Sequence, residues 1–236
     1  EEMYFHALRA SHELAKELGP CAAFSATRTQ QGVLQFDHWE SATPTDPARW
    51  TQLRADIQQD GLRNSLMIAI APTATIASIA GCFECIEPQV SNLFKRETLS
   101  GDFLVVNKYL VDVLKQQNLW TQDLRDAIKL SEGSVQRIEA LSPTQRAVFR
   151  TAWEIPQRAL IDLAASRNAY IDQSQSLNLF MESPKIGQLS SMYMYAWKKG
   201  LKTTYYLRSR PATKIAKTTV QATTQVVPVS EEQVIA

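Results

Sequence analysis

Near the end of the chain lies the run Lys202-Thr203-Thr204-Tyr205-Tyr206-Leu207-Arg208-Ser209-Arg210. The β-branched and aromatic residues of this run, from Thr203 to Leu207, predict a strand. A helix is predicted before it, because Ser183 can act as an N-cap, Pro184 suits the first turn and Gly200 follows the last turn. Residues 176–180 predict another strand before that helix. A strand, a helix and a strand in this order form a βαβ unit, so we expect a parallel pair with a right-handed crossover in an α/β fold.

Two tyrosines, Tyr205 and Tyr206, are adjacent in this run. Neighbouring side chains in a regular strand point to opposite faces, which would give the two rings unrelated roles. At the end of a strand or at a bulge, however, both rings can turn to the same side and stack. A phenol can lose an electron and its proton together, so a stacked pair can relay a radical. The alternative interpretation is a strand with two aromatic packing residues.

The overall composition limits the classes of protein to which the chain can belong. Its 236 residues predict one or two domains, and 44% hydrophobic residues suffice for a core. A net charge of +1 gives no sign of a DNA-binding or membrane-binding surface. No apolar stretch reaches the length of a membrane span, and the N-terminus lacks a signal-peptide pattern. Three cysteines, an odd number, fit a reducing compartment, so we expect a cytoplasmic location.

The first half of the chain contains a second α/β signal. The apolar run over residues 66–71 predicts a strand that is buried on both faces of a sheet. A short helix over residues 76–80 follows it, opened by Pro72-Thr73-Ala74-Thr75, and either threonine can be its cap. A helix N-terminus at the carboxyl end of a parallel strand can hold a phosphate through its N–H groups and its dipole, without a lysine. The alternative is a capped helix that binds no ligand.

Two cysteines in Cys82-Phe83-Glu84-Cys85 have the spacing of a redox pair or of half a zinc site. A second pair with metal-ligand spacing is missing from the sequence, and Cys21 stands alone. We therefore expect no metal to be bound by this chain. The pair is interpreted as structural or incidental thiols, and a redox role is the alternative.

The remaining pattern is mostly helical. Apolar spacing predicts a helix over residues 4–18 and another over residues 46–59. Residues 90–95 are interpreted as a loop, and residues 103–106 either as a short strand or as the approach to a helix that begins at Asn107. From residue 107 to about residue 174 we expect helices, with breaks at Trp120-Thr121, Gly133 and Ser142-Pro143. In the helix that follows Pro184, the residues expected to be buried are Ile186, Leu189, Tyr193 and Ala196.

Several further blocks of sequence indicate the family that the chain resembles. They are Gly32-Val33-Leu34-Gln35-Phe36-Asp37, Arg63-Asn64-Ser65-Leu66, Ala71-Pro72-Thr73-Ala74-Thr75-Ile76-Ala77, Ile86-Glu87-Pro88, Leu99-Ser100-Gly101-Asp102-Phe103 and Ile171-Asp172-Gln173-Ser174-Gln175-Ser176-Leu177-Asn178. Together with the run over residues 201–211 they resemble, in order, the large subunit of class I ribonucleotide reductase. The resemblance covers about residues 1–211 and implies the C-terminal part of that family's ten-stranded α/β barrel, with additional helices. Residues 212–236, which contain no aromatic residue, are expected to form a flexible tail.

The resemblance also implies a function. The family reduces ribonucleoside diphosphates to deoxyribonucleoside diphosphates with a protein thiyl radical, for DNA synthesis. Tyr205 and Tyr206 match its radical relay, and the segment that holds the substrate's diphosphate is matched by Pro72, Thr73, Ala74, Thr75 and Ile76. No Asn-x-Cys-x-Glu motif occurs here, so the thiyl cysteine and the effector sites for ATP and deoxynucleotides are expected before residue 1. The chain opens inside a predicted helix, so we expect it to be a piece of a longer protein.

The resemblance implies several partners. They are a ribonucleoside diphosphate, the small subunit with its metal-radical cofactor, the remainder of the large subunit, a homodimer partner, and thioredoxin or glutaredoxin. By itself the chain is expected to be inactive and to bind no cofactor. One alternative is a non-catalytic fragment or split-gene module that binds nucleotide or reductase subunits. Another is an adenosylcobalamin-dependent reductase, although such enzymes do not need the tyrosine pair. A generic α/β phosphate-binding domain explains residues 72–80 alone.

Overall fold

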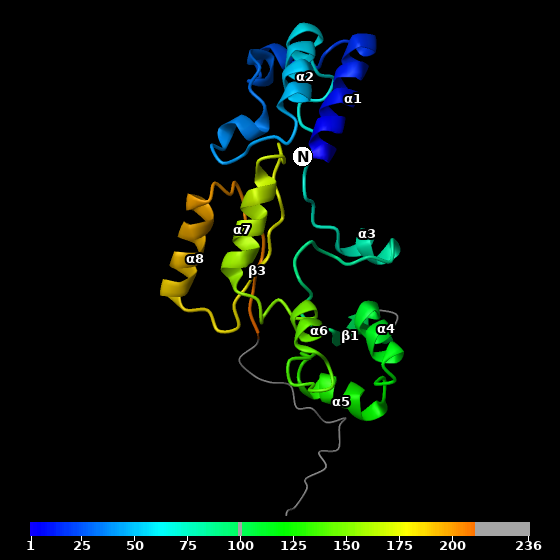
Figure 1. Ribbon diagram of the computed structural model, residues 1–236. Coiled ribbons are helices and arrows are strands. Elements are labelled where there is room, and N and C mark those ends of the chain that lie inside the picture. The colour runs from blue at the N-terminus through cyan, green and yellow to red at the C-terminus, as the bar shows by residue number, and fades with distance from the viewer. Residues whose placement is uncertain (99–100, 211–236) are drawn as a thin grey trace, which may run out of the picture. The chain divides into compact units, whose positions relative to one another are not determined.

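The computed structural model describes residues 1–98 and 101–210, and these form two compact units (Figure 1). One unit joins residues 1–90 to residues 150–210, and the other contains the described part of residues 91–149. Each unit is built around hydrophobic clusters of its own. The expected tail, residues 212–236, lies outside the described residues.

The first unit begins with two helices, α1 (Glu2–Leu18) and α2 (Pro47–Asp60), so both helices predicted in this region are confirmed. Asp46 caps α2, because its carboxylate accepts a hydrogen bond of 3.3 Å from the backbone N–H of Arg49. Gly61 ends the helix with a φ of 86°, a left-handed value that favours glycine. The connection between the two helices contains the 3₁₀ turns Phe24–Ala26, Thr29–Gln31 and Gln35–His38.

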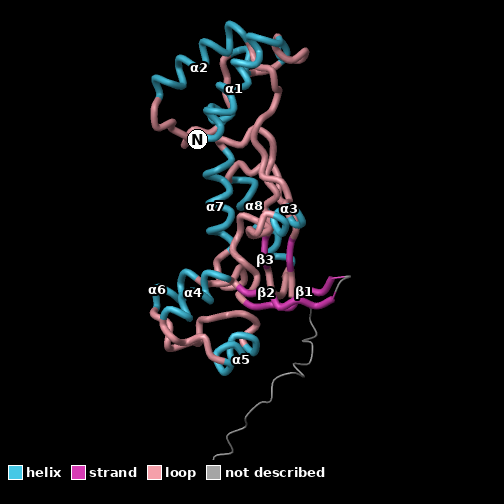
Figure 2. The backbone as a smooth tube through the Cα atoms, turned by 90° about the vertical axis from the view of Figure 1, so that its right-hand side faces the viewer, coloured by secondary structure: helices cyan, strands magenta, loops and turns pink. Residues whose placement is uncertain are grey.

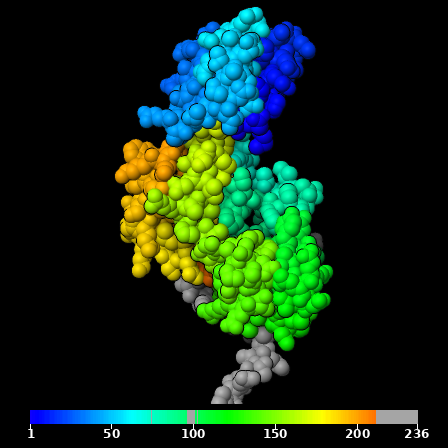
Figure 3. Space-filling view, in the orientation of Figure 1, coloured from blue at the N-terminus to red at the C-terminus, as the bar shows by residue number. Residues whose placement is uncertain are grey.

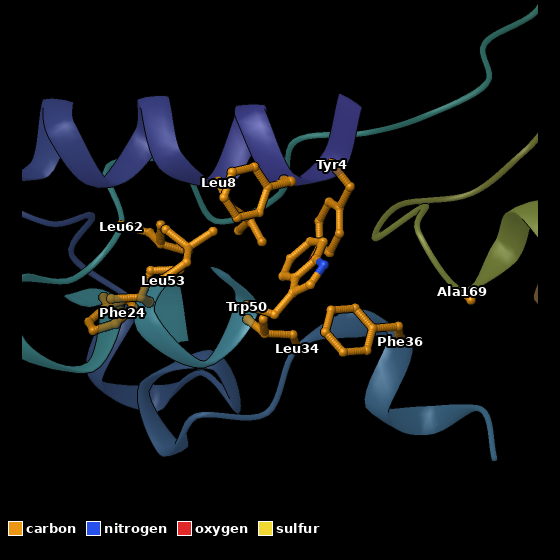
Figure 4. Packing of buried hydrophobic residues seen from close by; sticks show 11 residues of the cluster. Tyr4, Leu8, Phe24, Leu34, Phe36, Trp50, Leu53, Leu62 and Ala169 are labelled. Atoms are coloured by element: carbon orange, nitrogen blue, oxygen red, sulfur yellow. The ribbon is translucent and has the colours of Figure 1, made fainter. Parts of the chain in front are cut away.

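Trp50 on α2 lies at the centre of the core that α1, α2 and their connection share, and it is 2% exposed (Figure 4). Its ring meets the rings of Phe5 and Phe36 edge to face, with centroids 5.1 and 4.7 Å away. The other buried members are Tyr4, Leu8, Phe24, Leu34, Leu53, Ile57, Leu62 and Ala169. Because Ala169 directly follows α7 (Gln157–Asn168), this core fixes the N-terminal helices against the C-terminal part of the unit.

Residues 66–71 do not form the predicted strand. Among the described residues, this segment makes only one bridge, a parallel one from Ile70 to the central stretch, which we define as residues 171–179. The carboxylate of Asp172 accepts the N–H groups of Met67 and Ile68, at 2.8 and 2.7 Å, in place of a backbone partner. Backbone pairing with the central stretch is therefore limited to hydrogen bonds of Ile68 and Ile70. The expected burial on both faces is also wrong, since Leu66 is 53% exposed.

The predicted βαβ unit is present in the second half of the first unit. It consists of β3 (Leu179–Phe180), α8 (Ile186–Lys198) and β4 (Leu207–Arg208), and α8 lies beside α7 (Figure 3). The two strands pair in parallel, with Leu179 opposite Leu207, so the parallel pairing is confirmed. Both strands are shorter than predicted, and β4 begins directly after the tyrosine pair.

Helix α8 starts two residues later than predicted, and its buried face is rotated from the predicted one, although Ala196 is buried and Leu189 is partly buried as expected. The expected burial of Ile186 and Tyr193 is wrong, because they are 88% and 38% exposed, and Met192 is buried instead. A polar contact helps to set this rotation, since the hydroxyl of Tyr195 donates a hydrogen bond of 2.7 Å to the carboxylate of Asp162 on α7. Apolar spacing alone does not predict the hydrogen bond between Tyr195 and Asp162.

The second unit opens with an antiparallel hairpin of β1 (Leu93–Thr98) and β2 (Gly101–Val106), drawn in magenta in Figure 2. The predicted loop over residues 90–95 is therefore wrong from Leu93 onward, since residues 93–95 belong to β1. The charged run Lys95-Arg96-Glu97 is not typical of a strand. The strand expected over residues 103–106 is confirmed. Helices α4 (Lys108–Gln116), α5 (Gln122–Leu130) and α6 (Pro143–Val148) follow, capped by the side chains of Asn107, Thr121 and Ser142. Their buried partners include Leu110, Leu114, Ile128, Val135 and Leu141.

Candidate functional site

Tyr205 and Tyr206 lie directly before β4, and their rings turn to the same side, with centroids 4.0 Å apart and planes tilted by 46°. The hydroxyl of Tyr205 donates a hydrogen bond of 3.1 Å to the hydroxyl of Tyr206. This hydrogen bond raises the pKa of Tyr205, because ionisation would remove the donated proton. The two rings are 43% and 54% exposed, so neither is a core packing residue within the described chain. The geometry allows a hydrogen atom to pass between the two oxygens.

The run that carries the tyrosines is bonded along its length to the central stretch. The ammonium group of Lys202 donates to three successive carbonyl oxygens of that stretch, at 2.9, 3.1 and 2.6 Å. The hydroxyl of Thr203 donates to a further carbonyl at 3.0 Å. The backbone N–H of Tyr205 donates to the carbonyl of Leu177 at 2.7 Å. These bonds hold the backbone of the tyrosine pair in a fixed place before the strand begins.

The predicted phosphate-holding residues form the entry segment, Pro72–Ile76, which leads into α3 (Ala74–Ile79). The expected threonine cap is absent, because no side chain of the described residues caps α3. The hydroxyl of Thr73 instead donates a hydrogen bond of 2.9 Å to the carbonyl of Glu84 in the loop after the helix. The first turn of α3 therefore has no side-chain cap, and Ile76 is 70% exposed.

The entry segment and the tyrosine pair emerge at the same level beside the central stretch. Ile70 bridges to Gln175, and two residues further along the central stretch Leu177 accepts the N–H of Tyr205. Because parallel segments advance together, Pro72, two residues beyond Ile70, is at the level of Tyr205. In α/β proteins, ligands bind beyond the carboxyl ends of parallel strands, and the entry segment follows the bridge at Ile70 in this way, whereas the tyrosine pair precedes β4. The parallel register thus puts the entry segment and the tyrosine pair at one level beside the central stretch.

Glu87 belongs to this site, although its role was not predicted from the sequence. It is 7% exposed, and its carboxylate accepts the backbone N–H of Asn178 at 3.1 Å and the side-chain Nδ2 of the same residue at 3.2 Å. Asn178 precedes β3 and is opposite Tyr206 in the parallel register. The block Ile86-Glu87-Pro88 was the available signal, but nothing in its local pattern predicts a buried carboxylate.

Cys82 and Cys85 lie in the loop between α3 and Glu87, and both are exposed and free of disulfides. Burial of the Cys85 sulfur, together with the nearby charge of Glu87, raises the pKa of that thiol to about 11. In the part of the chain that the structure describes, no three His, Cys, Asp or Glu side chains gather as metal ligands would. None of the described helices is both long and apolar enough to cross a membrane.

Comparison with known proteins identifies the family of the chain. Residues 1–207 match a family model described as ribonucleotide reductase, barrel domain. Over 221 residues the chain is 46% identical to the ribonucleoside-diphosphate reductase large subunit of Arabidopsis thaliana and 45% identical to that of Caenorhabditis elegans. Each match covers 93% of this chain, but only 27% and 28% of the relative, so the chain spans little more than a quarter of their length.

A solved structure gives the same assignment at lower identity. The alpha subunit of the class Id ribonucleotide reductase of Actinobacillus ureae superposes with a TM-score of 0.62 and 29% identity. That match covers 86% of this chain and 31% of the other. The resemblance stated from the sequence motifs is thus confirmed: the chain belongs to the ribonucleotide reductase family and contains part of its α/β barrel domain.

Proposed function

We propose that this chain is the C-terminal part of a ribonucleoside-diphosphate reductase large subunit, which reduces ribonucleoside diphosphates to deoxyribonucleoside diphosphates for DNA synthesis. The observation that carries the proposal is the close pair Tyr205 and Tyr206, with ring centroids 4.0 Å apart and a 3.1 Å hydrogen bond between phenol oxygens. The names and identities of the relatives support the same activity. In this proposal the chain supplies the last steps of radical transfer and the site for the substrate's diphosphate.

The relay proceeds by hydrogen-atom exchange between the two phenols. When Tyr206 is a phenoxyl radical, it takes an electron and a proton from Tyr205. The O–H bond of Tyr205 breaks, an O–H bond forms on Tyr206, and the radical is then on Tyr205. The 3.1 Å separation of the two phenol oxygens supports this step, because the hydroxyl of Tyr205 is within hydrogen-bond reach of the oxygen that accepts its proton.

The entry segment is the proposed holder of the substrate's diphosphate. The first turn of α3 has no side-chain cap among the described residues, so its N–H groups can donate to phosphate oxygens. The positive end of the helix dipole favours the same anion. None of the five residues, Pro72, Thr73, Ala74, Thr75 and Ile76, is charged, so backbone donors carry this proposed contact.

The remaining parts of the reaction are assigned to other chains or to the rest of the large subunit. A small subunit with a metal-radical cofactor supplies the radical. The thiyl cysteine and the ATP and deoxynucleotide effector sites lie in the remainder of the large subunit, which pairs with a second copy. Thioredoxin or glutaredoxin supplies the reducing equivalents. Three free cysteines among the described residues support a reducing compartment, and we propose the cytoplasm.

The decisive experiment replaces each tyrosine by phenylalanine in the complete large subunit, with small subunit present. Phenylalanine keeps the ring and its packing but removes the O–H. Tyr205→Phe and Tyr206→Phe are each expected to abolish deoxynucleotide formation. Substrate affinity is expected to be unchanged, and stability to fall by no more than about 0.5–1.5 kcal/mol. Substantial turnover in both single variants would reject the relay and with it the proposed class I chemistry.

A non-catalytic module is the second candidate, because the chain spans little more than a quarter of its relatives' length. Such a module would bind nucleotide or a reductase subunit without chemistry. Complementation separates the two proposals. The chain is produced together with a large-subunit fragment that ends where the matched region begins. Restored nucleotide reduction supports a working part of the enzyme, and binding without reduction supports the module.

A further inference from the structure

We infer that Cys82 and Cys85 form a reversible disulfide that loosens the entry segment and so weakens nucleotide binding. The inference rests on the proposed function of the entry segment. It is independent of the thiols that drive turnover, which are expected outside this chain. Two observations motivate it: the thiols are separated by two residues on an exposed loop, and the carbonyl of Glu84 between them is the acceptor for Thr73.

The loop is attached to α3 on its N-terminal side. The backbone N–H of Cys82 donates to the carbonyl of Ala77 at 3.0 Å, and the Cys82 thiol donates to the same oxygen at 3.6 Å. Ala77 is 3% exposed, so this attachment point is buried. The hydroxyl of Thr73 reaches across to Glu84 at 2.9 Å. Cys82 is thus bonded directly to α3, and Glu84 is bonded directly to the entry segment.

The loop is equally fixed on its C-terminal side. Glu87 is buried, and its carboxylate accepts two hydrogen bonds from Asn178 on the central stretch. The Cys85 thiol donates to the Glu87 carbonyl at 3.7 Å. Since both ends are attached to buried residues, a strain applied between Cys82 and Cys85 must be taken up by the residues between them.

Closing a disulfide applies such a strain. The bond needs the two Cα atoms about 4.4–6.8 Å apart and each sulfur turned toward the other. Here the two thiols are turned to different carbonyls, of Ala77 and Glu87, and both contacts are lost when the thiol hydrogens leave. The carbonyl of Glu84 moves with the closing loop, and Thr73 loses its acceptor. The entry segment is then less ordered, which lowers its affinity for an anion.

The oxidant required is a low-molecular-weight disulfide. The thiolate of Cys82 attacks one sulfur of that disulfide, breaks its S–S bond and releases one thiol. Cys85 then loses its proton, attacks the sulfur of Cys82 in the mixed disulfide and releases the second thiol. The reagent gains two electrons and two protons, and the cysteine pair loses the same number. The raised pKa of Cys85 makes it the second, slower thiol of the exchange.

The first experiment tests the pair in the 236-residue chain. The chain is equilibrated with mixtures of reduced and oxidised glutathione, free thiols are alkylated, and the peptides are identified by mass spectrometry. We expect an intramolecular disulfide between Cys82 and Cys85, while Cys21 remains alkylated or carries glutathione. Glutathione adducts on Cys82 without an internal disulfide, across the whole range of mixtures, would overturn the inference.

The second experiment tests the coupling in the complete large subunit, with CDP as the probe. Oxidation is expected to weaken CDP binding by about three- to tenfold, the effect of losing one hydrogen bond. The variant with Cys82→Ser and Cys85→Ser is the matched control, and its affinity is expected to be the same in either redox state apart from effects of other cysteines. Thr73→Val removes the hydroxyl and keeps the shape, so it is expected to match the oxidised protein, and oxidation is expected to add nothing further.

The outcomes distinguish this inference from the proposed function. If Thr73→Val weakens CDP binding and oxidation of the pair does not, the redox inference is wrong and the nucleotide site stands. If neither change alters CDP binding, the entry segment is not the substrate site, although the disulfide found in the first experiment remains a property of the chain. Equal loss after oxidation in the double serine variant would also overturn the inference.

Discussion

The run with the tyrosine pair and the entry segment lie beside the same central stretch, but they are held in different ways. Lys202, Thr203 and Tyr205 each bond directly to that stretch, through a charged group, a hydroxyl and a backbone N–H. The hydrogen bonds described for the entry segment are local: Thr73 bonds to Glu84 in the next loop and, through its carbonyl, to the N–H of Ala77.

The difference matches what each element has to do in the proposed reaction. Hydrogen-atom exchange between two phenols depends on a short and constant distance, so many bonds along one run are appropriate. A segment that binds and releases a diphosphate gains from local bonds, which can adjust when a ligand arrives without disturbing the rest of the unit. Glu87 is the contact that joins the two, since it ends the loop after α3 and bonds to Asn178 opposite Tyr206.

The largest effect is therefore expected at Glu87. Glu87→Ala leaves two buried N–H donors of Asn178 without an acceptor, each costing about 1–3 kcal/mol, so the free energy of unfolding is expected to fall by about 3–4 kcal/mol. Urea denaturation of the chain measures it. Glu87→Gln is the matched control, because its amide oxygen can replace one of the two acceptors. If the free energy of unfolding falls only slightly, and by the same amount, in both variants, Glu87 does not join the two regions.

The next effect concerns the local bonds of the entry segment. Thr73→Pro removes a backbone donor and restricts the residue before it, so nucleoside-diphosphate affinity is expected to fall by about 1.5–3 kcal/mol. Titration of the complete large subunit with CDP measures this loss, and a melting curve checks the fold. Unchanged affinity with the fold intact would remove Pro72–Ile76 from the substrate site.

A smaller effect is expected where the tyrosine run has several bonds in parallel. Lys202→Met keeps most of the apolar stem but removes three donors to the central stretch, so stability is expected to fall by about 1–2 kcal/mol. Turnover of the complete enzyme is expected to fall more than CDP affinity does. Lys198→Met, at an exposed lysine of α8, is the control. An equal decrease in turnover and affinity would mean that the two regions are not held separately.

The smallest effect is expected from the cysteines under reducing conditions. The double change of Cys82 and Cys85 to serine is expected to leave turnover nearly intact, because the cysteines that drive turnover are expected outside the chain. Thioredoxin-supported activity of the complete enzyme measures this. A collapse of that activity at unchanged stability would show that the pair takes part in turnover itself.

Some of this structure was predictable because its causes are local. The apolar spacing and terminal residues of α1 and α2, the breaks before α5 and α6 at Trp120-Thr121 and Ser142-Pro143, and the parallel pairing of β3 with β4 all follow from short stretches of sequence. The adjacency of Tyr205 and Tyr206 was also visible in the sequence. Whether the two rings turn to the same side depends on where the strand begins, and the sequence alone did not predict that position.

The errors arise where distant side chains bond to the backbone. The strand predicted over residues 66–71 is wrong because Asp172, 105 residues after Met67, accepts the N–H groups of Met67 and Ile68. Burial of Glu87 depends on Asn178, 91 residues away. Analysis of apolar spacing within ten or twenty residues cannot identify a hydrogen-bond partner that is so far away in the sequence. The family motifs did mark both regions, since Ile86-Glu87-Pro88 and Ile171-Asp172 are among the blocks of resemblance, but without giving the contact.

The central stretch also determines where the chain can change length. Its successive residues set the register of Ile70 on one neighbour and of Tyr205 on the other. One residue inserted between Gln175 and Leu177 would shift the two neighbours relative to each other and move the tyrosines away from the level of the entry segment. The loop around Phe83 does not set the register of two neighbouring segments. Insertions and deletions among related chains should therefore accumulate there, while the central stretch should vary by substitution alone.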